Sequence, residues 1–259
     1  LPRDEDECVA AYQWMHEQPG KKLILGGGSN VLIDDRGYDG IVLFTNGLKR
    51  LDDLGNGRYV IGSGNDLGAM VRDIMVANNY AGVGGLTGIP GSVGGAIYMN
   101  AGTVNGSACQ LMETVDVLKA AGRQSIAMTP DLYSYRGQSF CAPGEVILGG
   151  MFAFTRAEED QRAIHEHYLQ RRREKQPPGY SCGSVFKNPP GDHAGRLIES
   201  CGLKGTRAGG AIISPMHANF IINENNARFE DIRTLIEMAK ARVRAAHGIE
   251  LEEEVRIIA

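Results

Sequence analysis

A glycine-rich stretch without charged side chains, residues 82–102, restricts the folding of this chain more than any other feature. It reads Gly-Val-Gly-Gly-Leu-Thr-Gly-Ile-Pro-Gly-Ser-Val-Gly-Gly-Ala-Ile-Tyr-Met-Asn-Ala-Gly. Glycine weakens helices and strands, so the composition predicts neither element here. The lack of charge and the interleaved apolar residues predict a buried or half-buried segment. Close packing between elements is one interpretation. A backbone that lies flat against a bulky planar ligand is the other, and the length of the stretch favours it.

A shorter glycine run, Gly26-Gly27-Gly28-Ser29-Asn30, lies between two predicted strands, residues 22–25 and 31–33. Consecutive glycines can turn their N–H groups toward one point and bind an anion, and serine and asparagine add donors. The run has neither the Rossmann spacing nor the Gly-Lys-Ser/Thr of a P-loop. A nest for a pyrophosphate is one interpretation. An ordinary tight turn is favoured on this evidence alone, because glycine turns are common.

Two further segments carry polar side chains suited to an anionic ligand. Residues 180–190 present Ser184, Lys187 and Asn188 between two proline pairs, which predicts a stiff, non-helical segment. An ordinary polar turn explains that segment equally well. Residues 133–140 contain Arg136, the side-chain type best able to clamp a carboxylate or phosphate with two hydrogen bonds. A surface loop with one solvated arginine is the alternative.

The bulk composition excludes several classes of protein. A net charge of −4 and a pI near 5.9 argue against a general nucleic-acid-binding protein. The five cysteines are scattered and lack metal-ligand spacing, so we expect reduced thiols, no metal site and a cytoplasmic protein. No apolar run reaches the ~20 residues of a membrane span, and no signal peptide is visible. Because the chain opens on Leu1 rather than methionine, we expect a truncated N-terminus.

Hydrophobic periodicity predicts a mixture of helices and strands over the rest of the chain. The predicted helices cover residues 4–18, 65–79, 156–175, 194–201 and 227–247, the last capped by Asn226. The predicted strands cover residues 41–44, 59–61, 114–119, 125–128, 145–154, 211–214, 219–223 and the neighbourhood of 255–257, with 114–119 and 125–128 forming a hairpin within residues 113–128. No Gly-x-Ser-x-Gly elbow is present, which disfavours a serine hydrolase.

Several motifs in a fixed order closely resemble the UDP-N-acetylenolpyruvoylglucosamine reductase (MurB) family. They are Leu-Gly-Gly-Gly-Ser-Asn, Gly-Ile-Pro-Gly-Ser-Val-Gly-Gly-Ala, Tyr-Arg-x-x-Ser-Phe, Gly-Ser-Val-Phe-Lys-Asn-Pro, His-Ala-Asn-Phe-Ile-Ile-Asn and Leu-Glu-Glu-Glu-Val-Arg. Each motif is modest, but their order is specific, and the match runs from about Lys22 to the C-terminus. The chain is similar to the shorter family type, and lacks the strand-and-turn stretch that precedes the first helix in the family.

The resemblance implies an α+β protein with a vanillyl-alcohol-oxidase-like, two-subdomain FAD-binding fold and a C-terminal α+β substrate-binding domain. It implies an FAD-binding region over residues 1–150, a substrate domain over 151–248, and a C-terminal strand, 249–259, that returns to the FAD-binding region. The implied cofactors are FAD and NADPH. The implied enzyme is a monomeric cytoplasmic UDP-N-acetylmuramate dehydrogenase of peptidoglycan synthesis. It reduces the enolpyruvyl group of UDP-GlcNAc-enolpyruvate with hydride from flavin N5. Nucleic acid and membrane insertion are not expected.

The resemblance also implies catalytic roles for Ser184, Arg136 and Glu254. Hydride addition to the methylene carbon leaves negative charge on the α-carbon and its carboxylate, and such charge needs electrostatic stabilisation. Arg136 is implied as the cationic stabiliser. Glu254 is implied as the second stabiliser, which must be protonated or act through hydrogen bonds. Ser184 is implied as the proton donor to the α-carbon.

Two further groups of residues follow from the resemblance. The implied FAD contacts are Gly26, Gly27, Gly28, Ser29, Asn30, Val31, Gly88, Ile89, Pro90, Gly91, Ser92, Gly94, Gly95, Ala96 and Arg256. The implied substrate contacts are Tyr135, Lys175, Lys187, Asn188 and Asn219. Two other functions stay open at this point, an FAD oxidase of the same fold and a nucleotide-sugar-binding protein without flavin. The absence of histidine from the glycine-rich stretches disfavours the covalent flavin attachment found in some oxidases, and the intact Arg136, Ser184 and Glu254 disfavour a binding protein.

Overall fold

The computed structural model describes residues 1–259, and their contacts form two compact units. Unit 1 comprises residues 1–28 and 39–170, and unit 2 comprises residues 29–38 and 171–259. These contact boundaries differ from the predicted functional division at residues 150 and 248. Residues 151–170 belong to unit 1 because Phe154 and Ala157 donate backbone hydrogen bonds to Gly57 and Asn79. Residues 29–38 belong to unit 2 because strand β2 pairs with the last strand, β16.

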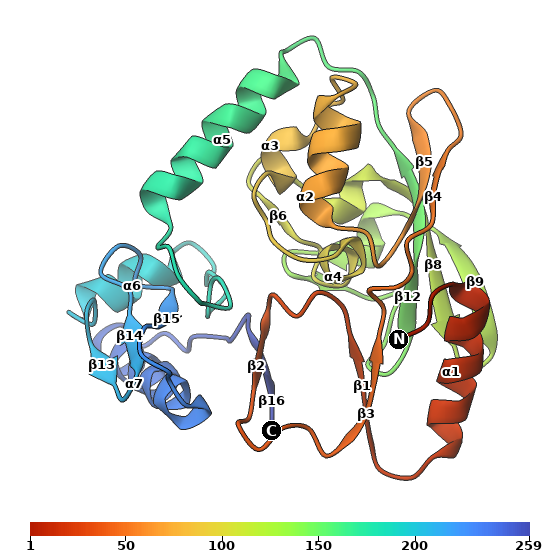
Figure 1. Ribbon diagram of the computed structural model, residues 1–259. Coiled ribbons are helices and arrows are strands. Elements are labelled where there is room, and N and C mark those ends of the chain that lie inside the picture. The colour runs from red at the N-terminus through yellow and green to blue at the C-terminus, as the bar shows by residue number, and fades with distance from the viewer. The chain divides into compact units, whose positions relative to one another are not determined.

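The centre of unit 1 is an antiparallel sheet with the strand order β4-β5-β12-β8-β9 (Figure 1). Its strands are β4 (Leu51–Asp53), β5 (Arg58–Gly62), β12 (Val146–Ala153), β8 (Met112–Lys119) and β9 (Gly122–Ala127). Val115 and Val117 of β8 are fully buried, as the alternating pattern of the strand requires. The predicted hairpin and the long strand after it are confirmed. The exposed edge strand β4 was not predicted, because its two aspartates give no strand signal.

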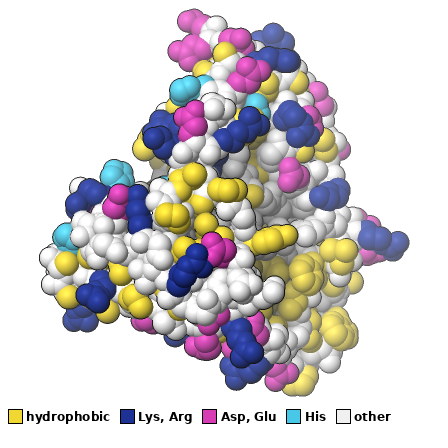
Figure 2. All heavy atoms as spheres, turned by 60° about the vertical axis from the view of Figure 1, so that its left-hand side comes forward, with side chains coloured by type: hydrophobic (Ala, Val, Ile, Leu, Met, Phe, Trp, Pro, Cys, Tyr) yellow, Lys and Arg dark blue, Asp and Glu magenta, His cyan; other side chains and the backbone are white.

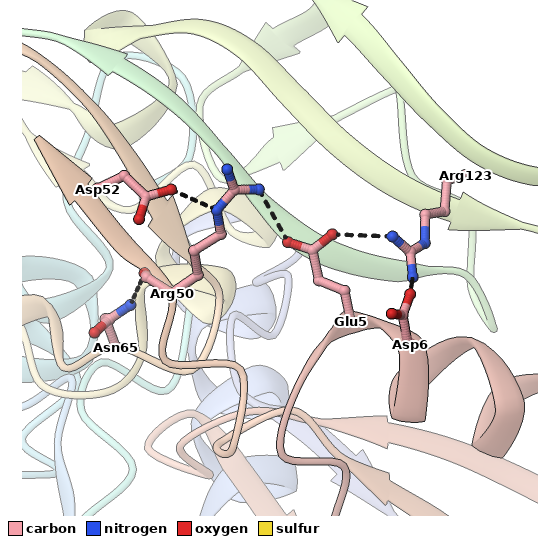
Figure 3. A network of polar contacts seen from close by, with 6 residues as sticks. All are labelled: Glu5, Asp6, Arg50, Asp52, Asn65 and Arg123. Carbon is pink, nitrogen blue, oxygen red and sulfur yellow. Dashed lines mark hydrogen bonds and ion pairs between the residues drawn. The ribbon is translucent and has the colours of Figure 1, made fainter. Parts of the chain in front are cut away.

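Helix α1 (Glu5–Glu17) packs on a separate parallel pair, β1 (Lys21–Leu25) with β3 (Gly40–Phe44). Asp4 caps the helix by accepting a hydrogen bond from the backbone N–H of Glu7 at 2.8 Å. Figure 3 shows how acidic residues at its start also join a network of ion pairs. Glu5 lies 3.6 Å from Arg50 and 3.4 Å from Arg123, which also pairs with Asp6. Ion pairs therefore connect the first helical turn to the residue before β4 and to strand β9.

The glycine-rich stretch contains two short helices, so the prediction that it forms no regular element was wrong. They are α3 (Val83–Leu86) and α4 (Val93–Tyr98), and most of their residues are buried, as predicted. Ser92 caps α4 by accepting a hydrogen bond from Gly95 N at 3.3 Å. Tertiary packing outweighs the low helix propensity of glycine here, because a Cβ added to Gly94 would lie 2.6 Å from Ser63 Cβ.

The predicted helix at residues 65–79 exists, but most of it is π-helical. It consists of one turn, α2 (Leu67–Ala69), followed by a π-helical segment, Met70–Val76. Asp66 caps its start through Ala69 N at 2.7 Å. All five residues of the predicted apolar face are buried, namely Leu67, Met70, Val71, Ile74 and Met75.

Smaller elements complete unit 1. They are the hairpins β6 (Gly102–Thr103) with β7 (Gly106–Ser107) and β10 (Tyr133–Ser134) with β11 (Gly137–Gln138), and the 3₁₀ turns Ala108–Leu111 and Pro130–Leu132. Helix α5 (Gln161–Lys175) crosses the boundary between the units. It begins five residues later than predicted because Asp160 caps it, accepting a hydrogen bond from Arg162 N at 2.9 Å.

Unit 2 packs two helices around a small antiparallel sheet with the order β13-β14-β15. Its elements are β2 (Val31–Ile33), α6 (Ala194–Ser200), β13 (Arg207–Ala208), β14 (Ala211–Ile213), β15 (Ile221–Asn223), α7 (Phe229–His247) and β16 (Arg256–Ile258). The predicted cap of the last helix, Asn226, is wrong. Helix α7 begins after Arg228, and its first N–H groups bond to carboxylates instead: Phe229 N to Asp35 at 2.9 Å and Arg228 N to Asp231 at 2.9 Å.

Three general features agree with the composition. All five cysteines are free thiols, and burial raises the pKa of Cys109 and of Cys141 to about 12. No helix combines the length and apolar character that a membrane span requires. On the face shown in Figure 2, lysine and arginine side chains are interspersed with aspartate and glutamate.

Candidate functional site

The two glycine-rich segments meet at Ser92 in unit 1. The N–H of Gly27 donates to Ser92 Oγ at 3.3 Å, and the same oxygen caps α4. A Cβ on Gly26 would lie 2.6 Å from Ser92 Oγ, and one on Gly27 would lie 3.1 Å from Gly91 Cα. A side chain at position 26 would therefore meet the Ser92 hydroxyl, and one at position 27 would meet the backbone of residues 91–92. The structure brings together segments that are 65 positions apart in the sequence and that were both predicted to hold one cofactor.

Gly27 is nevertheless exposed, and so are three other glycines of these segments. Gly28 and Gly88 are exposed and adopt φ of 71° and 69°, a left-handed conformation that glycine adopts without strain. Gly95 is also exposed, whereas Gly94 is buried. Exposed backbone without side chains fits a ligand with a diphosphate and a planar ring, because N–H groups can approach it closely. Both interpretations of the glycines thus apply, close packing at Gly94 and open backbone at Gly28, Gly88 and Gly95.

Two adjacent glycines of α4 give a matched pair of substitutions. Gly94→Ala would push a Cβ to 2.6 Å from Ser63 Cβ, so we expect the free energy of unfolding to fall by about 1–3 kcal/mol. In Gly95→Ala the nearest atom is 3.5 Å away, and the FAD-free protein should gain up to about 1 kcal/mol from helix propensity.

Thermal melting of the FAD-free proteins and FAD titration separate these effects. If FAD lies against Gly95, as predicted, Gly95→Ala weakens FAD binding without destabilising the FAD-free protein. Equal melting temperatures for Gly94→Ala and the parent would contradict the packing argument.

The remaining predicted FAD contacts are distributed over both units. In unit 1, Ile89 is half-buried, Pro90 is exposed and Ala96 is 5% exposed in the core. Ser29, Asn30, Val31 and Arg256 lie in unit 2.

In unit 2, backbone pairing brings together three predicted cofactor contacts, Asn30, Val31 and Arg256. Arg256 pairs with Val31 in the parallel β2–β16 ladder, and its N–H donates to Asn30 O at 3.0 Å. The side-chain amide of Asn30 donates to the carbonyl of Glu254 at 3.0 Å. The end of the glycine run, Asn30, therefore lies beside Glu254, two residues before β16 begins.

Arg136 lies in the two-residue turn of the β10–β11 hairpin, after Tyr135. Its φ is 56°, a left-handed conformation that is uncommon for a residue with a side chain and often found at functional sites. Its guanidinium donates to the carbonyl of Gly102 at 3.1 Å and lies 5.2 Å from the centre of the Tyr135 ring. The turn and these contacts position the Arg136 guanidinium at the end of the hairpin.

Asn100 anchors this hairpin, and the sequence analysis missed it. Its side-chain amide donates to Ser134 O at 2.8 Å and accepts from Cys109 N at 3.2 Å. An amide within a mainly apolar, buried stretch needs partners. This rule predicts that Asn100 has hydrogen-bond partners, but the sequence does not indicate which residues they are.

Ser184 lies in a segment whose backbone pairs with the C-terminal segment of unit 2. The carbonyl of Val185 accepts a hydrogen bond from Glu254 N at 2.8 Å, and Lys187 N donates to Glu252 O at 2.9 Å. These bonds hold Ser184 and Glu254 in a defined register, and both side chains are half-buried. The structure thus brings together two of the three predicted catalytic residues within unit 2. Arg136 belongs to unit 1.

Asn219, predicted to contact substrate, has its side chain fully engaged with the Ser184 segment. It is 4% exposed. Its amide accepts from Phe186 N at 2.9 Å and donates to Phe186 O at 2.8 Å, and its carbonyl accepts from Val185 N at 2.9 Å. The Asn219 side-chain amide thus bonds both backbone groups of Phe186, as a neighbouring β-strand would do. Contact with substrate stays a prediction.

The neighbouring His217 supports Asn219. Its Nδ1 accepts a hydrogen bond from Asn219 N at 3.2 Å, which requires that this nitrogen carry no proton. Burial, followed by the positive charge of Lys204, lowers the pKa of His217 and favours the neutral ring. Burial also raises the pKa of the Cys182 thiol to about 11, so this cysteine is a poor nucleophile.

The other predicted substrate contacts occupy varied positions. Lys187 forms an ion pair with Glu252, and Asn188 accepts a hydrogen bond from Ala194 N at 3.1 Å, at the start of α6. Lys175 is the last residue of α5. Tyr135 is 55% exposed. Whether these four residues bind substrate stays a prediction.

Comparison with known proteins identifies two parts of the chain. Residues 1–126 match the FAD binding domain family, and residues 174–258 match the C-terminal domain of UDP-N-acetylenolpyruvoylglucosamine reductase. An α+β fold with an FAD-binding domain and this C-terminal domain defines an FAD-dependent oxidoreductase.

Similarity to whole proteins defines the family. The reductase of Chlamydia abortus is 38% identical over 97% of this chain and 84% of its own length. The reductase of Thermotoga petrophila is 40% identical over 99% of this chain and 90% of its own length. The chain therefore belongs to the UDP-N-acetylenolpyruvoylglucosamine reductase (MurB) family. The crystal structure of the reductase from Thermus caldophilus, 32% identical, covers the whole chain with a TM-score of 0.83 and is itself 91% covered.

Proposed function

We propose that this chain reduces the enolpyruvyl group of UDP-N-acetylglucosamine enolpyruvate to the lactyl ether of UDP-N-acetylmuramate, with NADPH as the reductant. The observation that carries the proposal is the backbone pairing of the Ser184 segment with the Glu254 segment. The pairing sets the backbones of these two segments in register within unit 2, and together with the reductase family of the chain it supports joint roles for the Ser184 hydroxyl and the Glu254 carboxyl group.

FAD fits the glycine-rich backbone of unit 1, where Gly27, Gly28, Gly88 and Gly95 are exposed and carry no side chains. Bound there, FAD supplies hydride transfer from NADPH to the methylene carbon of the substrate. The N–H groups near Gly28 hold its diphosphate, and residues 88–96 hold its ring system.

The polar residues provide the rest of the chemistry. Arg136 stabilises the negative charge that develops on the α-carbon and its carboxylate. Glu254 stabilises the same charge through a hydrogen bond, because an ionised carboxylate would repel it. Ser184 gives its hydroxyl proton to the α-carbon. Lys175, Lys187 and Asn188 hold the nucleotide-sugar, with Tyr135 and Asn219 as further contacts.

This assignment divides the chain by function. Residues 1–150, joined by the strand at residues 249–259, bind FAD, and residues 151–248 bind substrate. The enzyme acts as a cytoplasmic monomer in peptidoglycan synthesis and so contributes to cell wall biogenesis, cell shape and cell division. The support for this role is the family and the chemistry of its substrate.

Anaerobic spectroscopy of the purified protein tests the proposal. We expect a flavin spectrum that NADPH bleaches and that UDP-N-acetylglucosamine enolpyruvate restores, with formation of UDP-N-acetylmuramate. UDP-N-acetylglucosamine, which lacks the enolpyruvyl group, should not restore the spectrum. Failure of the purified protein to bind FAD would refute the proposal. Bleaching without substrate-dependent recovery, followed by recovery in air, would indicate an oxidase.

A further inference from the structure

We propose that Asn100 is a positioning residue that holds the Arg136 hairpin in its working place. The inference rests on the proposed function, because it concerns the charge-stabilising role of Arg136. Asn100 follows α4, and its side-chain amide donates to the carbonyl of Ser134, two residues before Arg136, at 2.8 Å. Asn100 thus connects the predicted flavin-binding segment directly to the hairpin that carries the arginine.

The environment of Asn100 requires an asparagine. The residue is 6% exposed and has a φ of 40°, in the left-handed region where asparagine is enriched. The amide oxygen must accept from Cys109 N at 3.2 Å while the amide nitrogen donates to Ser134 O. Aspartate lacks the donor, and glycine lacks both groups. Losing the bond from Cys109 leaves the N–H of a residue that is 1% exposed without its partner, and losing the bond to Ser134 releases the base of the hairpin.

The hairpin needs an anchor outside itself. Strands β10 and β11 pair through two residues each, and so short a hairpin is not stable alone. A second contact comes from the same anchoring segment, because Arg136 Nη1 donates to Gly102 O at 3.1 Å. Gly102 is itself closely packed: it pairs with Ser107 in the β6–β7 hairpin, and a Cβ there would lie 2.3 Å from Gly106 O. Residues 100–102 therefore hold both the base of the hairpin and the guanidinium at its turn.

This arrangement has a consequence for the reaction. The predicted flavin-binding segment continues through α4 directly into residues 100–102, so the segment and the Arg136 hairpin are connected through the same stretch of backbone. Stabilising a developing charge depends on placing the cation to within a fraction of an ångström. Loosening the hairpin should therefore slow the reduction of substrate while FAD binding and the reduction of FAD by NADPH continue.

The test compares Asn100→Gly with the parent in separate half-reactions. Glycine tolerates the left-handed φ, so this variant removes the two hydrogen bonds without adding backbone strain. We expect substrate-dependent flavin reoxidation to slow by about 10- to 100-fold, and reduction by NADPH to change by less than about twofold, within the spread for uncoupled sites. Asn100→Asp keeps the acceptor for Cys109 N and should show the same selective loss. Reoxidation at the parent rate in both variants would overturn the inference.

A matched control separates positioning from general stability. Asn79 also has a left-handed φ, 55°, and its amide bonds to Ala157 O and Gln161 N at 2.9 Å each. Asn79→Gly should lower the melting temperature without selective loss of the reoxidation step. Equal slowing of both half-reactions in Asn100→Gly would show a merely structural role and would overturn the inference.

Two further readouts complete the test. In an Arg136→Ala background, Asn100→Gly should lower the rate of substrate-dependent flavin reoxidation by less than about twofold, because the effects of coupled residues are not additive. An undiminished cost there would overturn the inference. Hydrogen exchange of residues 133–138 should accelerate in Asn100→Gly but not in Asn79→Gly. Unchanged exchange in Asn100→Gly would show that Asn100 does not anchor the hairpin and would overturn the inference. This exchange experiment needs no substrate. It therefore tests the anchor even if the parent protein shows no reductase activity, a result that would refute the proposed function instead.

Discussion

Replacing Ser184 with alanine is expected to leave the reduction of bound FAD by NADPH near the parent rate and to abolish most product formation. Ser184 is the proposed proton donor to the α-carbon, and a positioned general acid contributes about 10²- to 10⁴-fold. We therefore expect substrate-dependent reoxidation of the flavin to slow by that factor. Stopped-flow measurement of the two half-reactions, with product analysis, gives the answer.

The structure makes this substitution a clean experiment. The segment around Ser184 is held by backbone bonds of Val185 and Lys187 and by the amide of Asn219. None of these bonds uses the Ser184 hydroxyl, so alanine should leave the segment in place.

Ser181→Ala is the matched control in the same segment. Ser181 Oγ accepts a hydrogen bond only from Gly183 N, at 3.4 Å, and the residue is exposed. This variant should react within about twofold of the parent, as expected of an exposed surface substitution. If Ser184→Ala forms product at a similar rate, Ser184 is not the proton donor.

Replacing Arg136 with alanine is expected to slow substrate reduction by about 10²- to 10³-fold, the usual cost of removing one group that stabilises a developing oxyanion. Reduction of FAD by NADPH should change little, because the charge on the α-carbon develops only when substrate reacts. Arg136→Lys should recover part of the rate, since it keeps the charge but loses the planar fork. Single-turnover kinetics with saturating substrate measures this step directly.

Arg123→Ala provides the comparison for a lost arginine in unit 1. Arg123 pairs with Glu5 and Asp6 on the surface, and its side chain is 41% exposed (Figure 3). Exposed ion pairs contribute little, so we expect unchanged half-reactions. Comparable slowing in Arg123→Ala and Arg136→Ala would mean that arginine loss acts through stability, and the catalytic role of Arg136 would then have to be abandoned.

Much of the fold could be predicted because its signals are local. The apolar face of residues 67–75, the hairpin around Gly122 and the long helix α7 follow from periodicity over a few turns or strand pairs. The errors arose where distant residues decide the outcome. Helix α7 is capped through Asp35, 194 positions away. Helices α3 and α4 contain glycines because distant segments pack closely there: a Cβ on Gly85 would lie 2.8 Å from Gly106 O, and one on Gly94 would lie 2.6 Å from Ser63 Cβ.

The candidate site shows the same division. Motifs named Ser184, Glu254 and Arg136 as candidates, because the required chemistry is carried by residue type and by order along the chain. The sequence alone could not distinguish a packed Gly94 from an exposed Gly95, since both are glycines of one motif. It also assigned Asn219 only to substrate, whereas the amide pairs with the backbone of Phe186.

The sequence by itself determined the family, the α+β class and the groups available for chemistry, because these depend on composition, local periodicity and ordered motifs. Only the tertiary structure decided how those groups are held. The Ser184 segment is paired in register with the Glu254 segment, and Asn100 reaches 34 positions along the chain to support the Arg136 hairpin. The physical reason is that a buried polar group must find a partner, and only the folded chain specifies which distant group that partner is.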